Sequence, residues 1–184
     1  MLSSQAGHCP STSGPRIFGY TTYVAAGLRH LHELEPPIIH GNLNAGKVYI
    51  GERNVVKVGE FGLAMLAQEF ATLAPTVSLA GITRWMSPEL LDNEDDSIVP
   101  TTASDIWALG CTIYEIVSKR LPYSDSIHDV EIVGKIKEGV APGAEDDQAV
   151  PGLPHLWPVI EDCWAVEPEQ RPTAFEVLKK ARGI

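Results

Sequence analysis

The chain has 184 residues, of which 44% are hydrophobic, and a formal net charge of −10. A chain of this length can bury one sizeable core, so we expect a single domain. The negative charge disfavours binding to nucleic acid or to anionic membranes, and no apolar run approaches the roughly 20 residues that a membrane-spanning helix needs.

The first 15 residues predict a disordered lead-in to a folded domain at residues 16–184. They are small, polar and rich in Ser, Gly and Pro, so they bury too little apolar surface to offset the entropy lost on ordering. They also lack the charged and apolar regions of a signal peptide. Cys9, Cys111 and Cys163 are widely spaced and odd in number, which favours neither disulfides nor a zinc site. We therefore expect an intracellular, cytoplasmic protein.

An amphipathic helix is predicted from about Ile17 to Leu34, because apolar residues recur there at helical spacing. These residues are Val24, Leu28, Leu31 and Leu34. Pro36 and Pro37 then end the helix. His30 and His32 are two residues apart and point to different faces of a helix, so we expect surface or hydrogen-bonded histidines rather than a metal pair.

A short β-hairpin is predicted to follow this helix. The runs 48–50 and 55–58 are rich in β-branched residues, and residues 51–54 have the composition of a turn. A hairpin brings its two ends together. Lys47 and Glu60, one at each end, are therefore expected to lie close in space and to form an ion pair.

Two loops are predicted next. Residues 64–82 show only weak periodicity with scattered Thr and Ser, as expected of a mobile loop. The acidic residues between 91 and 102 predict a solvated loop, because the alternating oxygen ligands and turn glycine of a calcium site are missing.

Helices account for most of the remaining chain. The strongest is predicted at 102–118, with Ser104 as its N-cap. A second is expected at about 130–138, where Val130, Val133 and Ile136 have helical spacing. Two more are expected at about 156–163 and 173–181. The predicted fold class is therefore α+β, mostly α, with one hairpin.

Several separated motifs occur in a fixed order along the chain. They are His40-x-x-Leu43, Phe61-Gly62, Trp85 to Glu89, Asp105 to Gly110, Cys163-Trp164 and Gln170 to Thr173. This ordered set resembles the C-terminal lobe of eukaryotic protein kinases over about residues 17–184, and it is most similar to the tyrosine-kinase-like group, which includes many Ser/Thr-specific enzymes. The resemblance implies a helical lobe whose hairpin carries the catalytic loop and the D-F-G-like loop. No glycine-rich loop or V-A-I-K lysine precedes residue 17, so we expect the N-terminal lobe to be absent.

The resemblance also implies architectural roles for several residues. Glu89 is expected to form a buried ion pair with Arg171. Asp105, in the first turn of a helix, is expected to accept backbone N–H groups of the loop around His40. His40 and Phe61 correspond to members of an apolar stack in the family. Gly62 keeps the last position of the family's D-F-G turn.

The family's reactive positions are changed in this sequence. In the pattern H-x-D-L-x-x-x-N the Asp acts on the substrate hydroxyl and the Asn holds magnesium, and D-F-G supplies a further metal ligand. Asn42 stands at the position of the base, Asn44 at that of a phosphate-contacting Lys, and Lys47 at that of the metal-binding Asn. Tyr49 falls at the floor of the adenine site, where an aromatic ring would crowd the nucleotide. Only Glu60, at the D-F-G Asp, keeps a metal-binding charge.

These substitutions predict a catalytically impaired, pseudokinase-like lobe that acts as a signalling or binding module. We expect no cofactor for the chain alone, ATP and magnesium only if an N-terminal lobe exists, and a protein partner such as another kinase or a separate N-terminal lobe. The alternative is a divergent ATP-dependent Ser/Thr protein kinase whose N-terminal lobe is missing from this chain. A degenerating gene remnant is the third hypothesis.

Overall fold

The structure is a computed structural model that describes residues 14–62, 81–91, 99–143 and 153–183. Most of the predicted lead-in, the loop at 64–82 and the acidic loop after Leu91 therefore lie outside the described residues. In chain order the described elements are α1 (Gly14–His32), η1 (Ala45–Lys47), β1 (Val48–Ile50), η2 (Glu52–Asn54), β2 (Val56–Val58), η3 (Thr83–Trp85), α3 (Pro88–Leu91), α4 (Thr102–Ser118), α5 (Asp129–Lys137), α6 (Leu153–Cys163), η5 (Pro168–Gln170) and α7 (Ala174–Ala181). The predicted fold class, mostly helical with one antiparallel hairpin, is confirmed.

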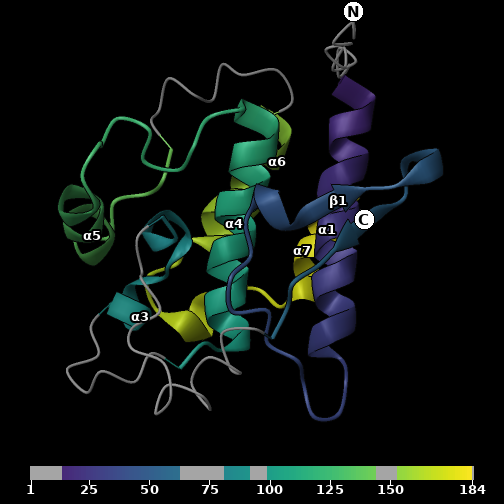
Figure 1. Ribbon diagram of the computed structural model, residues 1–184, viewed down its shortest axis with the longest axis horizontal. Coiled ribbons are helices and arrows are strands. Elements are labelled where there is room, and N and C mark those ends of the chain that lie inside the picture. Colours follow the sequence, from purple (N-terminus) through teal and green to yellow (C-terminus); the bar gives the residue numbers. More distant parts are fainter. Residues whose placement is uncertain (1–13, 63–80, 92–98, 144–152, 184) are drawn as a thin grey trace, which may run out of the picture.

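Helix α4 lies at the centre of the molecule (Figure 1). Its side chains are almost continuously buried and it packs against α1 and α6, which explains its high content of apolar residues. The predicted N-cap was wrong by three residues. Thr101 is the N-cap, and Ser104 is the third helical residue of a capping box in which each side chain accepts from the other's backbone N–H.

Helix α1 begins earlier than predicted, so Gly14 and Pro15 belong to it rather than to a disordered lead-in. It ends at His32, and Leu34, which was predicted to be on its apolar stripe, is 36% exposed. Val24 and Leu28 are fully buried as part of the core. The helix packs against α7 and β2.

The two strands pair antiparallel, with Val48 opposite Val58 and Ile50 opposite Val56. Strand β2 lies close to α1, because a Cβ atom at Gly27 would be only 3.0 Å from Cγ2 of Val58. A glycine in α1 therefore lets the hairpin approach the helix closely. Strand β2 thus lies against α1, and η1, just before the hairpin, contacts α4.

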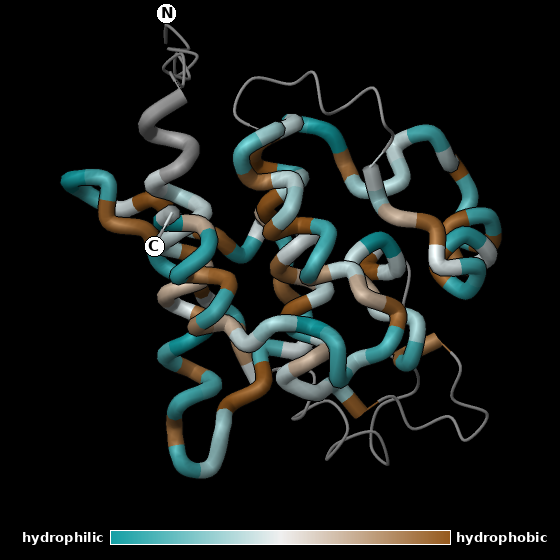
Figure 2. Tube along the Cα trace, turned by 180° about the vertical axis from the view of Figure 1, so that it is seen from behind, coloured by the Kyte–Doolittle hydropathy of each residue, from teal (hydrophilic) through white to brown (hydrophobic). Residues whose placement is uncertain are grey.

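The C-terminal helices α5, α6 and α7 agree with the prediction in position but not always in register. On α5 the buried residues are Ile132 and Ile136, whereas Val130 is 83% exposed. Thr173, the first residue of the range predicted for this helix, caps α7 in a capping box with Glu176. Figure 2 shows apolar residues as separate short bands along the helices. None of the described helices is both long and apolar enough to cross a membrane.

Candidate functional site

The loop after α1 is held by the buried carboxylate of Asp105, which is 1% exposed. Its two oxygens accept the backbone N–H groups of His40 at 2.7 Å and of Gly41 at 2.8 Å. The predicted contact between Asp105 and this loop is therefore present. His32 Nε2 also lies 2.8 Å from Asp105 Oδ2, an interaction that the sequence did not predict. In the sequence, the spacing of His32 from His30 bears only on a possible metal pair. The distance between His32 and Asp105 depends instead on how α1 packs against α4.

His40 is fully buried between the loop and the hairpin. Its Nδ1 accepts the backbone N–H of Asn42 at 3.3 Å, and its Nε2 lies 3.1 Å from the carbonyl oxygen of Gly59. These partners select the neutral imidazole with its proton on Nε2. Burial lowers the pKa of His40 below its ordinary value of 6.5, because the charged form loses its hydration.

The lowered pKa of His40 predicts that acid destabilises the folded chain. As the pH falls below 6.5, the unfolded chain takes up a proton at this histidine before the folded chain does, so the free energy of unfolding falls. In urea unfolding from about pH 7.5 to about pH 5.5, we expect His40→Phe to lose part of this pH dependence, since phenylalanine does not titrate. His30→Gln, at an exposed position, is the control and should leave the pH dependence of the free energy of unfolding unchanged. If the free energy of unfolding depended equally on pH in the wild type and in His40→Phe, the lowered pKa of His40 would be contradicted.

The side chain of Asn44 is engaged within the loop itself, and its Nδ2 also lies 3.5 Å from Oδ1 of Asn42. Asn44 Nδ2 donates to the carbonyl oxygen of Asn42 at 3.3 Å, and Asn44 Oδ1 accepts the N–H of Gly46 at 2.9 Å to cap η1. An amide has no useful proton affinity, so neither side chain serves as a general base.

Lys47 and Glu60 lie at the two ends of the hairpin, where the N–H of Gly59 donates to the carbonyl oxygen of Lys47 at 3.0 Å. The Lys47 ammonium binds Glu60 Oε2, so the predicted ion pair is present. The Tyr49 hydroxyl donates to the other carboxylate oxygen, Oε1, at 2.5 Å. The hydrogen bonds from Lys47 and Tyr49 lower the pKa of Glu60, and the bond to Glu60 raises the pKa of Tyr49. Both oxygens of this carboxylate therefore have partners within the chain.

Two predicted site residues are more exposed than expected. Tyr49, which was expected at the floor of the adenine site, is 46% exposed. Its ring lies over Gly59 and its hydroxyl reaches Glu60. Phe61 is 43% exposed. Gly62 adopts a φ of 72°, and its N–H donates to the carbonyl oxygen of His40 at 3.2 Å. The D-F-G-like turn is thus bonded to the loop through its backbone.

Glu115 provides a second attachment of the loop to α4. Its Oε2 accepts the N–H of Ala45 at 3.1 Å and the indole N–H of Trp85 at 3.1 Å. Burial raises the pKa of this carboxyl group despite these hydrogen bonds. The sequence analysis missed Glu115, although its position on the predicted helix, away from the solvated loops, was a signal that it needed partners.

Arg171 and Glu89 form the predicted ion pair with bidentate geometry, at 2.7 and 2.8 Å. The Arg171 side chain is fully buried, and its remaining donors bond to backbone carbonyl oxygens of Ala103, Ala165 and Val166. Burial alone would raise the pKa of Glu89, but the hydrogen bonds from Arg171 outweigh it and lower the pKa. The pair fastens the segment after residue 81 to the start of α4 and to the loop before α7.

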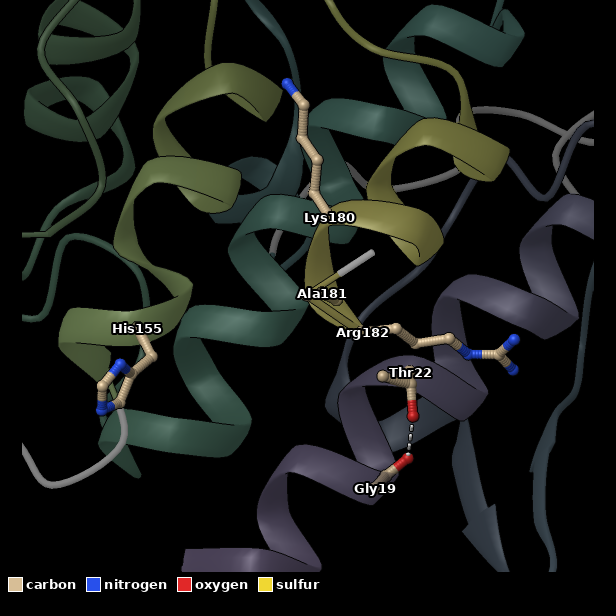
Figure 3. A pocket seen from close by; sticks show the side chains of 7 residues that line it. Gly19, Thr22, His155, Lys180, Ala181 and Arg182 are labelled. Carbon is tan, nitrogen blue, oxygen red and sulfur yellow. Dashed lines mark hydrogen bonds between the residues drawn. The ribbon is translucent and has the colours of Figure 1, made fainter.

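The described residues contain no cluster of acidic, His or Cys side chains that is suited to a metal ion. Two cavities lie away from the loop at His40. One, of about 510 Å³, is formed by α1, α6 and α7, and in Figure 3 the side chains of His155, Lys180 and Arg182 point in different directions from its wall. The other, of about 480 Å³, lies beside Arg171 and the start of α7. The candidate site is the constellation around residues 40–62, where the structure brings predicted site residues together.

The sequence that builds this site matches a known class of protein. Residues 6–181 match the family model described as protein tyrosine and serine/threonine kinase, so the chain belongs to the protein kinase family. That description, which joins the two specificities, agrees with the expected likeness to the tyrosine-kinase-like group.

Individual relatives support this assignment. The chain is 33% identical over 159 residues to mitogen-activated protein kinase kinase kinase 3 of Arabidopsis thaliana, which covers 86% of the chain and 26% of that relative. It is 36% identical over 160 residues to the probable serine/threonine-protein kinase WNK6 of Oryza sativa subsp. japonica, which covers 85% of the chain and 33% of that relative. The chain thus spans about a quarter to a third of the length of these relatives.

Proposed function

We propose that this protein kinase domain is catalytically impaired and acts as a binding module in signalling. The observation that carries the proposal is the state of Glu60. This is the only acid at the family's metal-binding positions, and its two oxygens are taken by Lys47 and Tyr49. We propose that the module works in the cytoplasm with a protein partner, either another kinase or a separate N-terminal lobe.

The residues present do not suit the magnesium ion that the family uses with ATP. The Lys47 ammonium has only donors and carries the same sign of charge as the metal, so it would repel the ion from the position that it shares with Glu60. Asn42 and Asn44 add neither a base nor a cationic phosphate contact. We therefore derive no phosphoryl-transfer step through this site.

The thermal unfolding of the purified chain should not respond to ATP with magnesium. We expect Lys47→Asn to make magnesium raise the melting temperature, because the substitution removes the ammonium and leaves the Glu60 carboxylate free. Lys119→Asn is the matched control: it makes the same charge change at an exposed residue whose φ of 60° suits asparagine. A magnesium-dependent ATP shift in the wild-type chain would count against the proposal.

A divergent Ser/Thr protein kinase is the second candidate, favoured by the names of the relatives and by the acid retained at Glu60. It predicts that a generic protein substrate is phosphorylated on hydroxyl groups and that Glu60→Ala abolishes this activity. The degenerate-remnant hypothesis predicts instead that the chain fails to unfold cooperatively in urea. The buried pair of Arg171 and Glu89 favours a cooperatively folded unit.

A further inference from the structure

The cavity of about 480 Å³ beside Arg171 lies between the end of α1, the start of α4 and the start of α7. Helix α1 packs against both of the other helices (Figure 1). The lining includes the apolar residues Ile106 and Ala174, each of which is 2% exposed. Cavities of about 300–1,000 Å³ that combine an apolar lining with a few fixed polar groups are typical of small-molecule sites.

His32 supplies a fixed polar group in this lining. Its side chain is only 10% exposed, and its Nε2 lies 2.8 Å from Asp105 Oδ2. A carboxylate oxygen only accepts hydrogen bonds, so Nε2 carries the proton and Nδ1 is the acceptor of the neutral ring. Nδ1 has no hydrogen-bond partner among the described residues, and it is not sealed from solvent. A ligand that bonds to His32 must therefore offer a donor.

Phe175 supplies an aromatic ring in the same lining and is 49% exposed. The guanidinium carbon of Arg29 lies 4.6 Å from the centre of this ring, and Arg29 Nε donates to Glu33 at 2.7 Å. The ring and the guanidinium are both planar, and both stack favourably with aromatic groups. The cavity therefore suits a flat aromatic ligand.

The charges of the lining favour a neutral or positive ligand over an anion. All five N–H donors of Arg171 are used, by Glu89 and by three backbone carbonyl oxygens. Arg29 is paired with Glu33. Glu169 also lines the cavity and has no ion-pair partner among the described residues. Its negative charge is uncompensated there and repels carboxylates and phosphates.

From these observations we propose that this cavity binds a small aromatic molecule that carries an N–H donor and is uncharged or positively charged. Its ring stacks at Phe175, and its donor bonds to Nδ1 of His32. The site is separate from the one at residues 40–62, so it goes beyond the function proposed above and does not depend on the state of Glu60.

Binding in the cavity should also stabilise the loop at His40. His32 Nε2 and the backbone N–H of His40 both contact Asp105 Oδ2, at 2.8 and 2.7 Å. A ligand that bonds to the other nitrogen of His32 restrains the ring that helps to hold this carboxylate. Amide hydrogen exchange at His40 should therefore become slower when the cavity is filled.

The test is a titration of the purified, isotope-labelled full chain, followed by the NMR shifts of the backbone amides of Ala103, Ala174 and Phe175. The probes are benzamidine, benzamide and benzoate, which share one flat shape and differ in charge and in N–H donors. We expect benzamidine and benzamide to bind with dissociation constants of about 1 mM or below. Benzoate should bind at least about tenfold more weakly, because it is an anion without a donor. Saturating benzamidine should slow amide exchange at His40 several-fold.

Two substitutions test the assigned contacts. Phe175→Leu removes the ring at a half-exposed position and should raise the dissociation constant of benzamidine about fivefold. His32→Gln keeps an N–H donor toward Asp105 but removes Nδ1, so it should raise the dissociation constants of benzamidine and benzamide several-fold. Tyr23→Leu is the matched control, because it removes a ring that is 53% exposed and lies outside the lining, and it should change neither constant.

Four results would overturn this proposal. The first is no detectable binding of benzamidine or benzamide at about 10 mM. The second is benzoate binding as tightly as benzamidine. The third is a dissociation constant that neither Phe175→Leu nor His32→Gln changes, which would place the probe elsewhere. The fourth is unchanged amide exchange at His40 with benzamidine at saturation. The response of melting temperature to ATP with magnesium is measured separately, so failure here is distinguishable from failure of the proposed catalytic impairment.

Discussion

Replacing Arg171 with methionine is expected to lower the free energy of unfolding by about 3–5 kcal/mol, because it leaves Glu89 half-buried without its partner. The substitution also removes the donors that bond to the carbonyl oxygens of Ala103, Ala165 and Val166. Urea denaturation monitored by tryptophan fluorescence measures the loss. The Arg171 guanidinium lies 5.2 Å from the ring of Trp107, so that probe reports on the same region.

Two further variants separate charge from geometry at Arg171. Arg171→Lys keeps the positive charge but not the planar fork, so we expect it to recover only part of the lost stability. Arg182→Met removes the same group from an exposed position and should change the free energy of unfolding by less than about 0.5 kcal/mol. If Arg171→Met lowered the free energy of unfolding as little as Arg182→Met, the ion pair of Arg171 with Glu89 would not stabilise the fold.

Asp105→Asn is expected to cost about 3 kcal/mol in the free energy of unfolding, because one carboxylate oxygen is replaced by a donor that faces other donors. The N–H groups of His40 and Gly41 lie 2.7 and 2.8 Å from the two oxygens, so at least one of them loses its acceptor whichever way the amide is turned. The second measurement is amide hydrogen exchange at His40 and Gly41, which should become faster in the variant.

Asp125→Asn is the control for Asp105→Asn. It makes the same chemical change on a side chain that is 73% exposed, and it removes one surface ion pair with Lys135. We expect a loss of less than about 1 kcal/mol and no change in exchange at His40 or Gly41. Unchanged exchange in Asp105→Asn would show that the loop keeps its shape without the carboxylate.

Spacing along the sequence predicted the long helices and the hairpin, because burial of one face imposes a period that can be read locally. Spacing did not predict the outcome where two nearby residues suit the same role. Ser104 and Thr101 both suit an N-cap, and only the course of the backbone assigns them to the two ends of one capping box. On α5, Val130 and Ile132 are both β-branched apolar residues, and the side that is buried depends on how the helix packs against η3 and α3.

In the site, contacts between motif residues were predictable because the family resemblance places them. The pair of Glu89 with Arg171 is an example, whereas closure of the hairpin predicted that of Lys47 with Glu60. Contacts made by residues outside the motifs were not predictable. His32 and Glu115 lie 73 and 70 residues from the groups they bind, Asp105 and the N–H of Ala45, and nothing local reveals such a distance in sequence.

Asp105 and Glu115, both on α4, accept hydrogen bonds from the loop at two points. Neither residue stands at a reactive position of the family. The residues that hold the loop in shape are therefore different from the residues at the family's reactive positions. Positions 42, 44 and 47 can be rewritten without rebuilding the supports that hold them. Asp, Lys and Asn can therefore be introduced at these positions one at a time, and phosphoryl transfer can be measured after each substitution.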